Sequence, residues 1–181
     1  NFNMIKKLPL IILSLFLFAF CHKESEKPVA QLNIYVCDAP VYIDSMIFQI
    51  YSIIFYPDTT DNKIIINWDN PIKINVLDYT NDRDTLIASL SYNSDKIDRI
   101  KMKLGKNVKI KINNTTTNLK IKDDTIICVK LKYKYIINNR LVYNFYLDFN
   151  TYKSIKIDSK NRIYIEPEIK LLDDSLCGSV K

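Results

Sequence analysis

Three oxygen-bearing side chains lie where two apolar runs of the sequence end, and together they could bind a metal ion. Asp38 follows the run Leu32–Cys37, and Asp148 and Asn150 close the later run that starts at Leu141. If the two runs form neighbouring strands, these side chains meet at one end of a sheet and offer the oxygens that calcium prefers. In the competing interpretation, Asp38 caps a turn and Asp148 holds a loop in place by hydrogen bonds. This interpretation is favoured, because the sequence contains no calcium-binding loop of the EF-hand type. We therefore predict no metal, and these residues are the first to examine.

Lysines recur at every second position of several runs and could bind an acidic ligand. The stripe consists of Lys101, Lys103, Lys109, Lys111, Lys120, Lys122, Lys130, Lys132 and Lys134. If its runs are neighbouring strands, one sheet face is basic and could hold an acidic polysaccharide or an anionic envelope surface, with Lys130, Lys132 and Lys134 as the ligand candidates. The alternative is a solvated face whose lysines also guard sheet edges. This alternative is favoured, because Ile, Lys, Asn and Tyr are abundant throughout the sequence, as expected of a protein encoded by an AT-rich genome. For the same reason, the net charge of +6 does not indicate nucleic-acid binding, and we expect no nucleic-acid partner.

Aromatic rings offer a second route to binding sugars. Sugar platforms use exposed rings, and Trp68, beside the turn Asp69–Pro71, is the ring that we expect to be exposed. Most other rings, such as Tyr56, Tyr133 and Tyr143, occupy inward positions of expected strands and are predicted to pack in the core.

The sequence lacks the residues that most catalytic sites need. His22 is the only histidine, and Gly105 and Gly178 are the only glycines, which argues against Ser-His-Asp, Cys-His and histidine-zinc sites and against a glycine-rich phosphate loop. The carboxylate pairs Asp123–Asp124 and Asp173–Asp174 are adjacent in sequence and point apart, whereas a glycosidase needs two facing carboxylates. We expect no enzyme and no cofactor; a carboxylate-based hydrolase stays as a distant alternative.

The elements that must position these side chains are short strands. Apolar and polar residues alternate with a period of two, and turn signals recur about every ten residues. In the long run Met46–Tyr56, one face is expected to carry Met46, Phe48, Ile50, Ile54 and Tyr56. The segments Ile64–Trp68 and Ile72–Val76 are expected as separate strands, Ile127–Tyr135 as the longest alternating strand, and Thr85–Leu90 as either a strand or one helical turn. The pattern predicts an all-β, single-domain antiparallel β-sandwich over residues 32–172.

Residues 4–21 indicate where this domain is located. Lys6 and Lys7 precede an apolar run of signal-peptide length that ends at Cys21. The segment resembles a bacterial lipoprotein signal in which Cys21 is lipidated, and the acidic cluster of Glu24 and Glu26 resembles the export tag of some surface lipoproteins. Phe20 departs from the small residue usual before the cysteine, so an uncleaved anchor, or cleavage elsewhere, stays open. Residues 22–31 are expected to be a tether and residues 173–181 a tail.

Three cysteines remain if Cys21 is lipidated: Cys37, Cys128 and Cys177. An odd number cannot pair completely, and Cys37 and Cys128 lie in strand-like runs, where small buried thiols are common. Free, buried thiols are expected in preference to a disulfide.

Several pieces of the sequence occur in the order found in one family. They are Val36–Pro40, Ser45–Tyr56, Asn75–Asp78, Ile97–Leu104, Leu147–Asn150 with Ser154–Ile155, and Ile165–Ile169. On these pieces the chain resembles the family called domain of unknown function 4382, found in bacterial lipoproteins; Asn150 and Glu168 replace a usual Asp and a usual apolar residue. The resemblance implies an extracytoplasmic β-sandwich similar to prealbumin-like and immunoglobulin-like domains, and it implies no catalytic residue.

These observations lead to one expectation about function. We expect a lipid-anchored structural or binding module of the cell envelope, an outer-membrane lipoprotein that is periplasmic or exposed at the surface. Its expected partner is the membrane, through the lipid at Cys21. A glycan or an envelope protein could be a further partner. A carbohydrate-binding or adhesion component is the first alternative.

Overall fold

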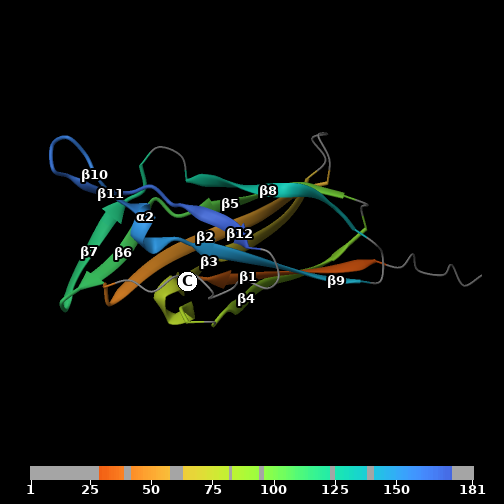
Figure 1. Cartoon of the computed structure of the whole chain (residues 1–181), viewed down its shortest axis with the longest axis horizontal. Helices are drawn as coiled ribbons and strands as arrows, with labels where there is room; N and C mark the ends of the chain where they lie inside the picture. The colour runs from red at the N-terminus through yellow and green to blue at the C-terminus, as the bar shows by residue number, and fades with distance from the viewer. Residues whose placement is uncertain are drawn as a thin grey trace, which may run out of the picture.

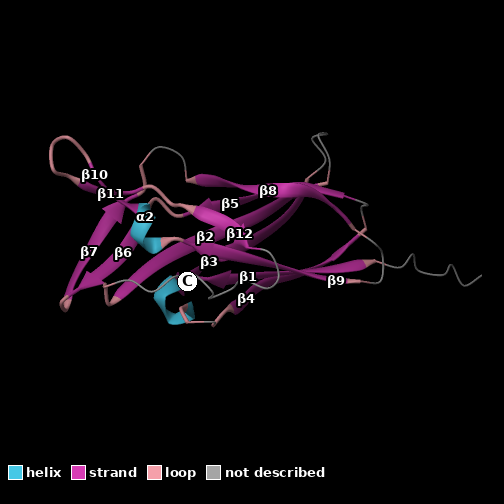
Figure 2. Ribbon diagram, viewed as in Figure 1, coloured by secondary structure: helices cyan, strands magenta, loops and turns pink. Residues whose placement is uncertain are grey.

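The structure is a computed structural model of the chain in which the described residues are 29–38, 42–57, 63–81, 83–93, 96–122, 125–137 and 141–172, with backbone alone for 130 and 132–135. The predicted lipoprotein signal with Cys21, and the tail after residue 172, lie outside these ranges. Within them the chain forms two stacked sheets and a small third one, elongated along the strands (Figure 1). Strands dominate, and in the described part of the chain no helix is long and apolar enough to cross a membrane (Figure 2).

The first layer is a four-stranded sheet in the order β12-β9-β1-β4. Its strands are β1 (Ala30–Cys37), β4 (Thr85–Tyr92), β9 (Val142–Phe149) and β12 (Ile169–Leu172). β1 runs antiparallel to β4 but parallel to β9, and it pairs with β9 from Gln31 to Cys37. More than a hundred residues separate β1 from β9 in sequence, so no hairpin constrains their relative direction.

The second layer is built around β2 (Ser45–Tyr56), which has β3 (Ile64–Asn75) on one side and β6 and β5 in succession on the other. The remaining strands are β5 (Lys96–Leu104), β6 (Asn107–Ile112), β7 (Thr115–Lys120) and β8 (Ile126–Ile136). β7 flanks β6, and β8 flanks β5. A hairpin of β10 (Ile155–Ile157) and β11 (Ile163–Ile165), a 3-10 turn η1 (Val76–Tyr79) and a helical turn α2 (Thr151–Ser154) complete the domain.

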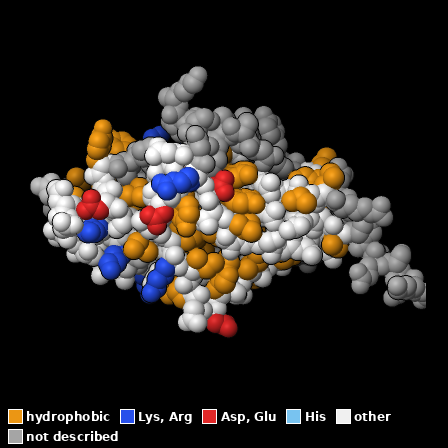
Figure 3. All heavy atoms as spheres, turned by 90° about the horizontal axis from the view of Figure 1, so that it is seen from below, with side chains coloured by type: hydrophobic (Ala, Val, Ile, Leu, Met, Phe, Trp, Pro, Cys, Tyr) orange, Lys and Arg blue, Asp and Glu red, His pale blue; other side chains and the backbone are white. Residues whose placement is uncertain are grey.

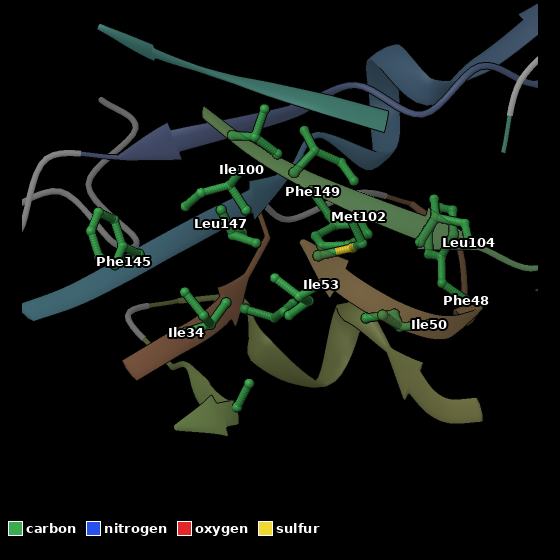
Figure 4. Close-up of a cluster of buried hydrophobic side chains, with 14 of the residues drawn as sticks. Ile34, Phe48, Ile50, Ile53, Ile100, Met102, Leu104, Phe145, Leu147 and Phe149 are labelled. Atoms are coloured by element: carbon green, nitrogen blue, oxygen red, sulfur yellow. The ribbon is translucent and has the colours of Figure 1, made fainter. Parts of the chain in front are cut away.

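The core lies between the two inner faces and confirms the all-β sandwich. Alternate residues of β1, β2, β5 and β9 point into it from both sides (Figure 4). Phe48 of β2 and Phe149 of β9 bridge the layers, with ring centroids 5.2 Å apart. Burial of these large side chains removes apolar surface from water, which is the main force that holds the layers together.

A bulge in β2 changes which of its residues face the core. The pairing of β2 with both neighbours shifts between Ile50 and Ser52. An extra residue in one strand reverses the alternation beyond it. Met46, Phe48 and Ile50 are therefore followed in the core by Ile53 and Phe55, all almost completely buried. The expected inward positions of Ile54 and Tyr56 were wrong: both are half-buried and face outward beside Lys101 and Arg99.

β3, β8 and β1 also differ from expectation, and the structure decides between the two alternatives for Thr85–Leu90. Residues 64–75 form one strand, and the break expected at Asp69–Pro71 is an irregularity within it, between the pairs Ser52–Asn67 and Ile50–Ile72. Pro71 is tolerated there because β3 is an edge strand. The register of β8 shifts between the positions opposite Ile97 and Arg99, so the long alternation expected there is interrupted. Thr85–Tyr92 is a strand, and β1 begins at Ala30, inside the expected tether.

The two cysteines in the described part of the chain, Cys37 and Cys128, are thiols and not members of a disulfide. Cys37 is buried and places its Sγ 3.9 Å from the carbonyl oxygen of Leu147. Cys128 is exposed, which corrects the expectation of a buried thiol, because its neighbours Ile127 and Val129 take the inner face of β8. Cys177 lies outside the described residues.

Candidate functional site

One pocket lies on the outer face of the six-stranded sheet, and strand register places its residues. Ile47 of β2 pairs with Lys109 of β6, and Lys109 pairs with Asn118 of β7. On the other side of β2, Gln49 pairs with Lys73 of β3. Paired residues share a face, so four strands contribute to one surface.

This sheet-face pocket has a volume of about 340 Å³, and its lining combines cations with amides. The lining residues are Ile47, Gln49, Lys73, Asn107, Lys109 and Asn118. Ile47 and Gln49 are half-buried and form the floor, whereas the other four are exposed. The two floor residues lie on a central paired strand, which positions them more precisely than a loop would.

Gly105 makes room for the amide on the floor of the pocket. Its backbone N–H donates to the carbonyl oxygen of Gln49 across 2.8 Å. A Cβ at position 105 would stand 2.7 Å from Gln49 Oε1 and 3.0 Å from Gln49 Cβ, both closer than a normal contact. The absence of a side chain at this turn between β5 and β6 therefore lets Gln49 occupy its present place.

The chemistry of the sheet-face pocket suits a polar, acidic ligand. Lysine ammonium groups donate up to three hydrogen bonds and attract carboxylates, while each amide side chain both donates and accepts. The lining residues include no carboxylate to oppose Lys73 and Lys109. The pocket thus offers positive charge together with the mixed donors and acceptors that hydroxyl groups need.

The lysine stripe is only partly assembled on this face. Lys101, Lys103, Lys109, Lys111 and Lys120 share it through the pairing of β2, β5, β6 and β7. Lys122 instead places its ammonium group 5.0 Å from the ring centre of Tyr164 of β11. The side chains of the ligand candidates Lys130, Lys132 and Lys134 lie outside the described set.

Sequence reasoning missed most residues of this pocket. Lys73, which was left out of the stripe, lines it, and so do Gln49, Asn107 and Asn118. The available signal was that polar residues alternate with apolar residues in their strands, which places them on the outer faces. Trp68, the predicted sugar platform, is half-buried and packs against the hydrophobic core, so its ring is less exposed than expected.

Two of the three residues considered for a metal, Asp38 and Asn150, accept hydrogen bonds from groups in α2. Asp38 is buried and accepts hydrogen bonds from the backbone N–H of Thr151, at 3.2 Å, and from the Thr151 hydroxyl. Asn150 Oδ1 accepts from the N–H of Lys153 and caps α2. Within the described residues, His, Cys, Asp and Glu form no group of three that could hold a metal ion. Asp38 acts here as a link between the end of β1 and the start of α2.

Asp148 lies apart from this link, on the outer face of the four-stranded sheet, between Cys37 of β1 and Lys170 of β12. Burial raises the pKa of the Asp148 carboxyl above its ordinary value; Lys170 lowers that pKa by a smaller amount, and Glu168 raises it further. The adjacent carboxylates Asp123–Asp124 and Asp173–Asp174 lie outside the described residues.

The fold and the pocket define a class: an all-β sandwich with a basic, amide-lined hollow on one sheet. The model of the family described as "Domain of unknown function (DUF4382)" matches residues 29–167, and the chain belongs to this family. Searches of the curated proteins and of the solved structures give no significant match. The match covers every strand of the sandwich except β12.

Proposed function

We propose that the protein is a lipid-anchored binding module of the cell envelope that holds acidic glycans in the sheet-face pocket. The observation that carries this proposal is the meeting of two lysines and three amides on a floor of paired strands. A sugar acid needs both a cation for its carboxylate and donors and acceptors for its hydroxyls. The proposal makes the protein a binder and not an enzyme.

The size of the pocket supports a sugar chain in preference to an isolated small ligand. Small-ligand pockets span about 300 to 1,000 Å³, and a volume of about 340 Å³ is at the lower limit. One sugar residue fits, and its neighbours in the chain would extend over the same face toward Lys103, Lys111 and Lys120. Electrostatic attraction from these lysines would increase the association rate more than the specificity.

The position of the chain entry is compatible with anchoring. β1 begins at the end of the molecule opposite β6 and β7, which carry part of the pocket (Figure 1). A lipid on Cys21 of an outer-membrane lipoprotein would therefore hold the pocket end away from the membrane. Labelling of cells with a palmitate analogue tests the anchor: the label is expected on the wild type and absent from Cys21→Ala, and label on both variants would contradict it.

Binding is tested with the full chain in detergent, titrated calorimetrically with oligogalacturonate. The double variant Lys73→Gln, Lys109→Gln is expected to bind about tenfold more weakly, since each charge-assisted hydrogen bond contributes about 1.5–3 kcal/mol and solvent offsets part of it. The matched control Lys153→Gln, Lys160→Gln removes two exposed lysines outside the pocket. Equal losses in both double variants would show nonspecific attraction and would refute the pocket.

A further inference from the structure

β4 is an edge strand with little of the protection that edges usually have: its one such feature is the bulge between Leu86 and Ala88, where its pairing with β1 shifts. In the described part of the chain it pairs with β1 alone, so no described strand covers its other side. Its sequence, TLIASLSY, contains no charge, no proline and no glycine over eight residues. Exposed edges of this kind favour the addition of another strand, and proteins usually block them with lysine, proline or a bulge.

The other edges of the two large sheets carry more of this protection. β7 has only six residues, ends at Lys120, and leads into the bridge between Ile121 and Ile165 of β11. β3 contains Pro71 and the irregularity around it, with Lys73 beyond. β12 has only four residues, and its Lys170 forms an ion pair with Glu168 across 3.1 Å. β8 has three lysines in its sequence and an interrupted register. β4 has a single register shift, opposite Ile34 and Tyr35, and the stretch from Ala88 to Tyr92 is regular.

The surface beside β4 is also uncharged. The outward residues of β1 that pair with β4 are Gln31, Asn33 and Tyr35. Gln31 Nε2 donates to Ser89 Oγ across 3.0 Å and to Asn33 Oδ1 across 3.2 Å. In the view from below, the visible charged side chains lie over the end that contains β6 and β7 and over the middle of the molecule, whereas the described surface toward the end where β1 begins shows hydrophobic and uncharged polar side chains (Figure 3).

We propose that β4 pairs antiparallel with β4 of a second copy of this chain and so joins the two four-stranded sheets. The charge distribution argues for a second copy: copies of a chain with net charge +6 repel each other at their lysine-rich faces, but two β4 strands bring no charges together. A two-fold axis makes the contact self-complementary and closed. If the two-fold axis passes through Ser89 or Leu90, each residue of one β4 strand lies opposite a residue of the other that points to the same side of the sheet. The core-facing sides of the two four-stranded sheets then stay on the same side of the joined sheet.

The pairing is tested with two tagged forms of the full chain, co-expressed and purified through one tag in detergent. Wild-type copies are expected to co-purify. Ser89→Lys in both copies places two cations near the two-fold axis and is expected to reduce co-purification about fivefold. Ser89→Lys in one copy with Ser89→Glu in the other is expected to restore it, since opposite charges then meet.

Thr116→Lys in both copies is the matched control, because it adds the same charge to the exposed strand β7. It is expected to leave co-purification unchanged. Absence of co-purification in the wild type would overturn the proposal. So would equal recovery in all pairs, which would indicate association through the detergent micelle, or a failure of the Lys–Glu pair to recover.

Discussion

At the scale of single residues, loss of the buried Asp38 side chain is expected to destabilise the fold. Asp38→Ala leaves the buried N–H and hydroxyl of Thr151 without their acceptor. An unsatisfied buried donor costs about 1–3 kcal/mol, so urea unfolding should show a loss of about 2–4 kcal/mol. The exposed Asp69→Ala is the control and should change stability by less than about 0.5 kcal/mol. Equal effects would contradict the link between β1 and α2.

Asp148 gives a pH dependence with a definite sign. Burial raises its pKa in the folded state, so the folded protein holds the proton more tightly than the unfolded chain does. The contribution of this group to stability is therefore fully present below the ordinary pKa of 3.8 and is lost as pH rises through the folded pKa. Asp148→Asn should be more stable than the wild type at pH 7, and the difference should vanish on acidification.

Asp158 provides the opposite case in the same titration. Hydrogen bonds from Arg162 and Lys160 hold the pKa of Asp158 below its ordinary value, the N–H of Arg162 having the largest effect. Its stabilising contribution is therefore present above 3.8 and is lost as pH falls through the folded pKa. Asp158→Asn should be less stable than the wild type at neutral pH, with a gap that closes in acid. Parallel trends in the two variants would contradict these assignments.

At the scale of elements, the β2 bulge can be tested with two neighbouring isoleucines. Ile53 is completely buried, whereas Ile54 is half-buried on the outer face. Ile53→Ala should cost about 2–5 kcal/mol in denaturant unfolding, and Ile54→Ala about 1 kcal/mol. Strict alternation from Met46 predicts the reverse order, so a larger loss for Ile54→Ala would disprove the bulge.

The same strand shows how far sequence reasoning extends. Alternation predicted the all-β sandwich, because burial between two sheets imposes a period of two. It could not predict the bulge after Ile50, since nothing in an all-apolar run marks where an extra residue enters. The break at Asp69–Pro71 was detected, but an edge strand accommodates it without ending.

The candidate pocket was less accessible to prediction than the fold. Lys109 was singled out because it alternates with Val108 and Ile110, and the structure places it in the pocket. Lys73 comes beside Lys109 only through β2, which pairs with both β3 and β6. Such neighbours depend on strand order, which a single sequence does not contain. Asp38 was expected as a turn cap, whereas its partner Thr151 is 113 residues away.

At the scale of the whole molecule, the two sheets present different surfaces. The outer face of the six-stranded sheet carries lysines and the sheet-face pocket. On the four-stranded sheet, the outer face is mostly uncharged, with Tyr35 and Tyr146 stacked at a centroid distance of 4.9 Å. Under the two proposals, the basic face would bind glycans while copies of the chain would associate through the neutral edge at β4.

The most direct test of the glycan-binding proposal observes the pocket amides themselves. The side-chain NH₂ signals of Gln49, Asn107 and Asn118 can be followed by nuclear magnetic resonance while the ¹⁵N-labelled full chain is titrated with oligogalacturonate. The proposal predicts that these three signals shift together and saturate, whereas that of Asn144 on the opposite sheet stays in place. Shifts spread evenly over the exposed amides, or an unchanged spectrum at saturating ligand, would contradict it.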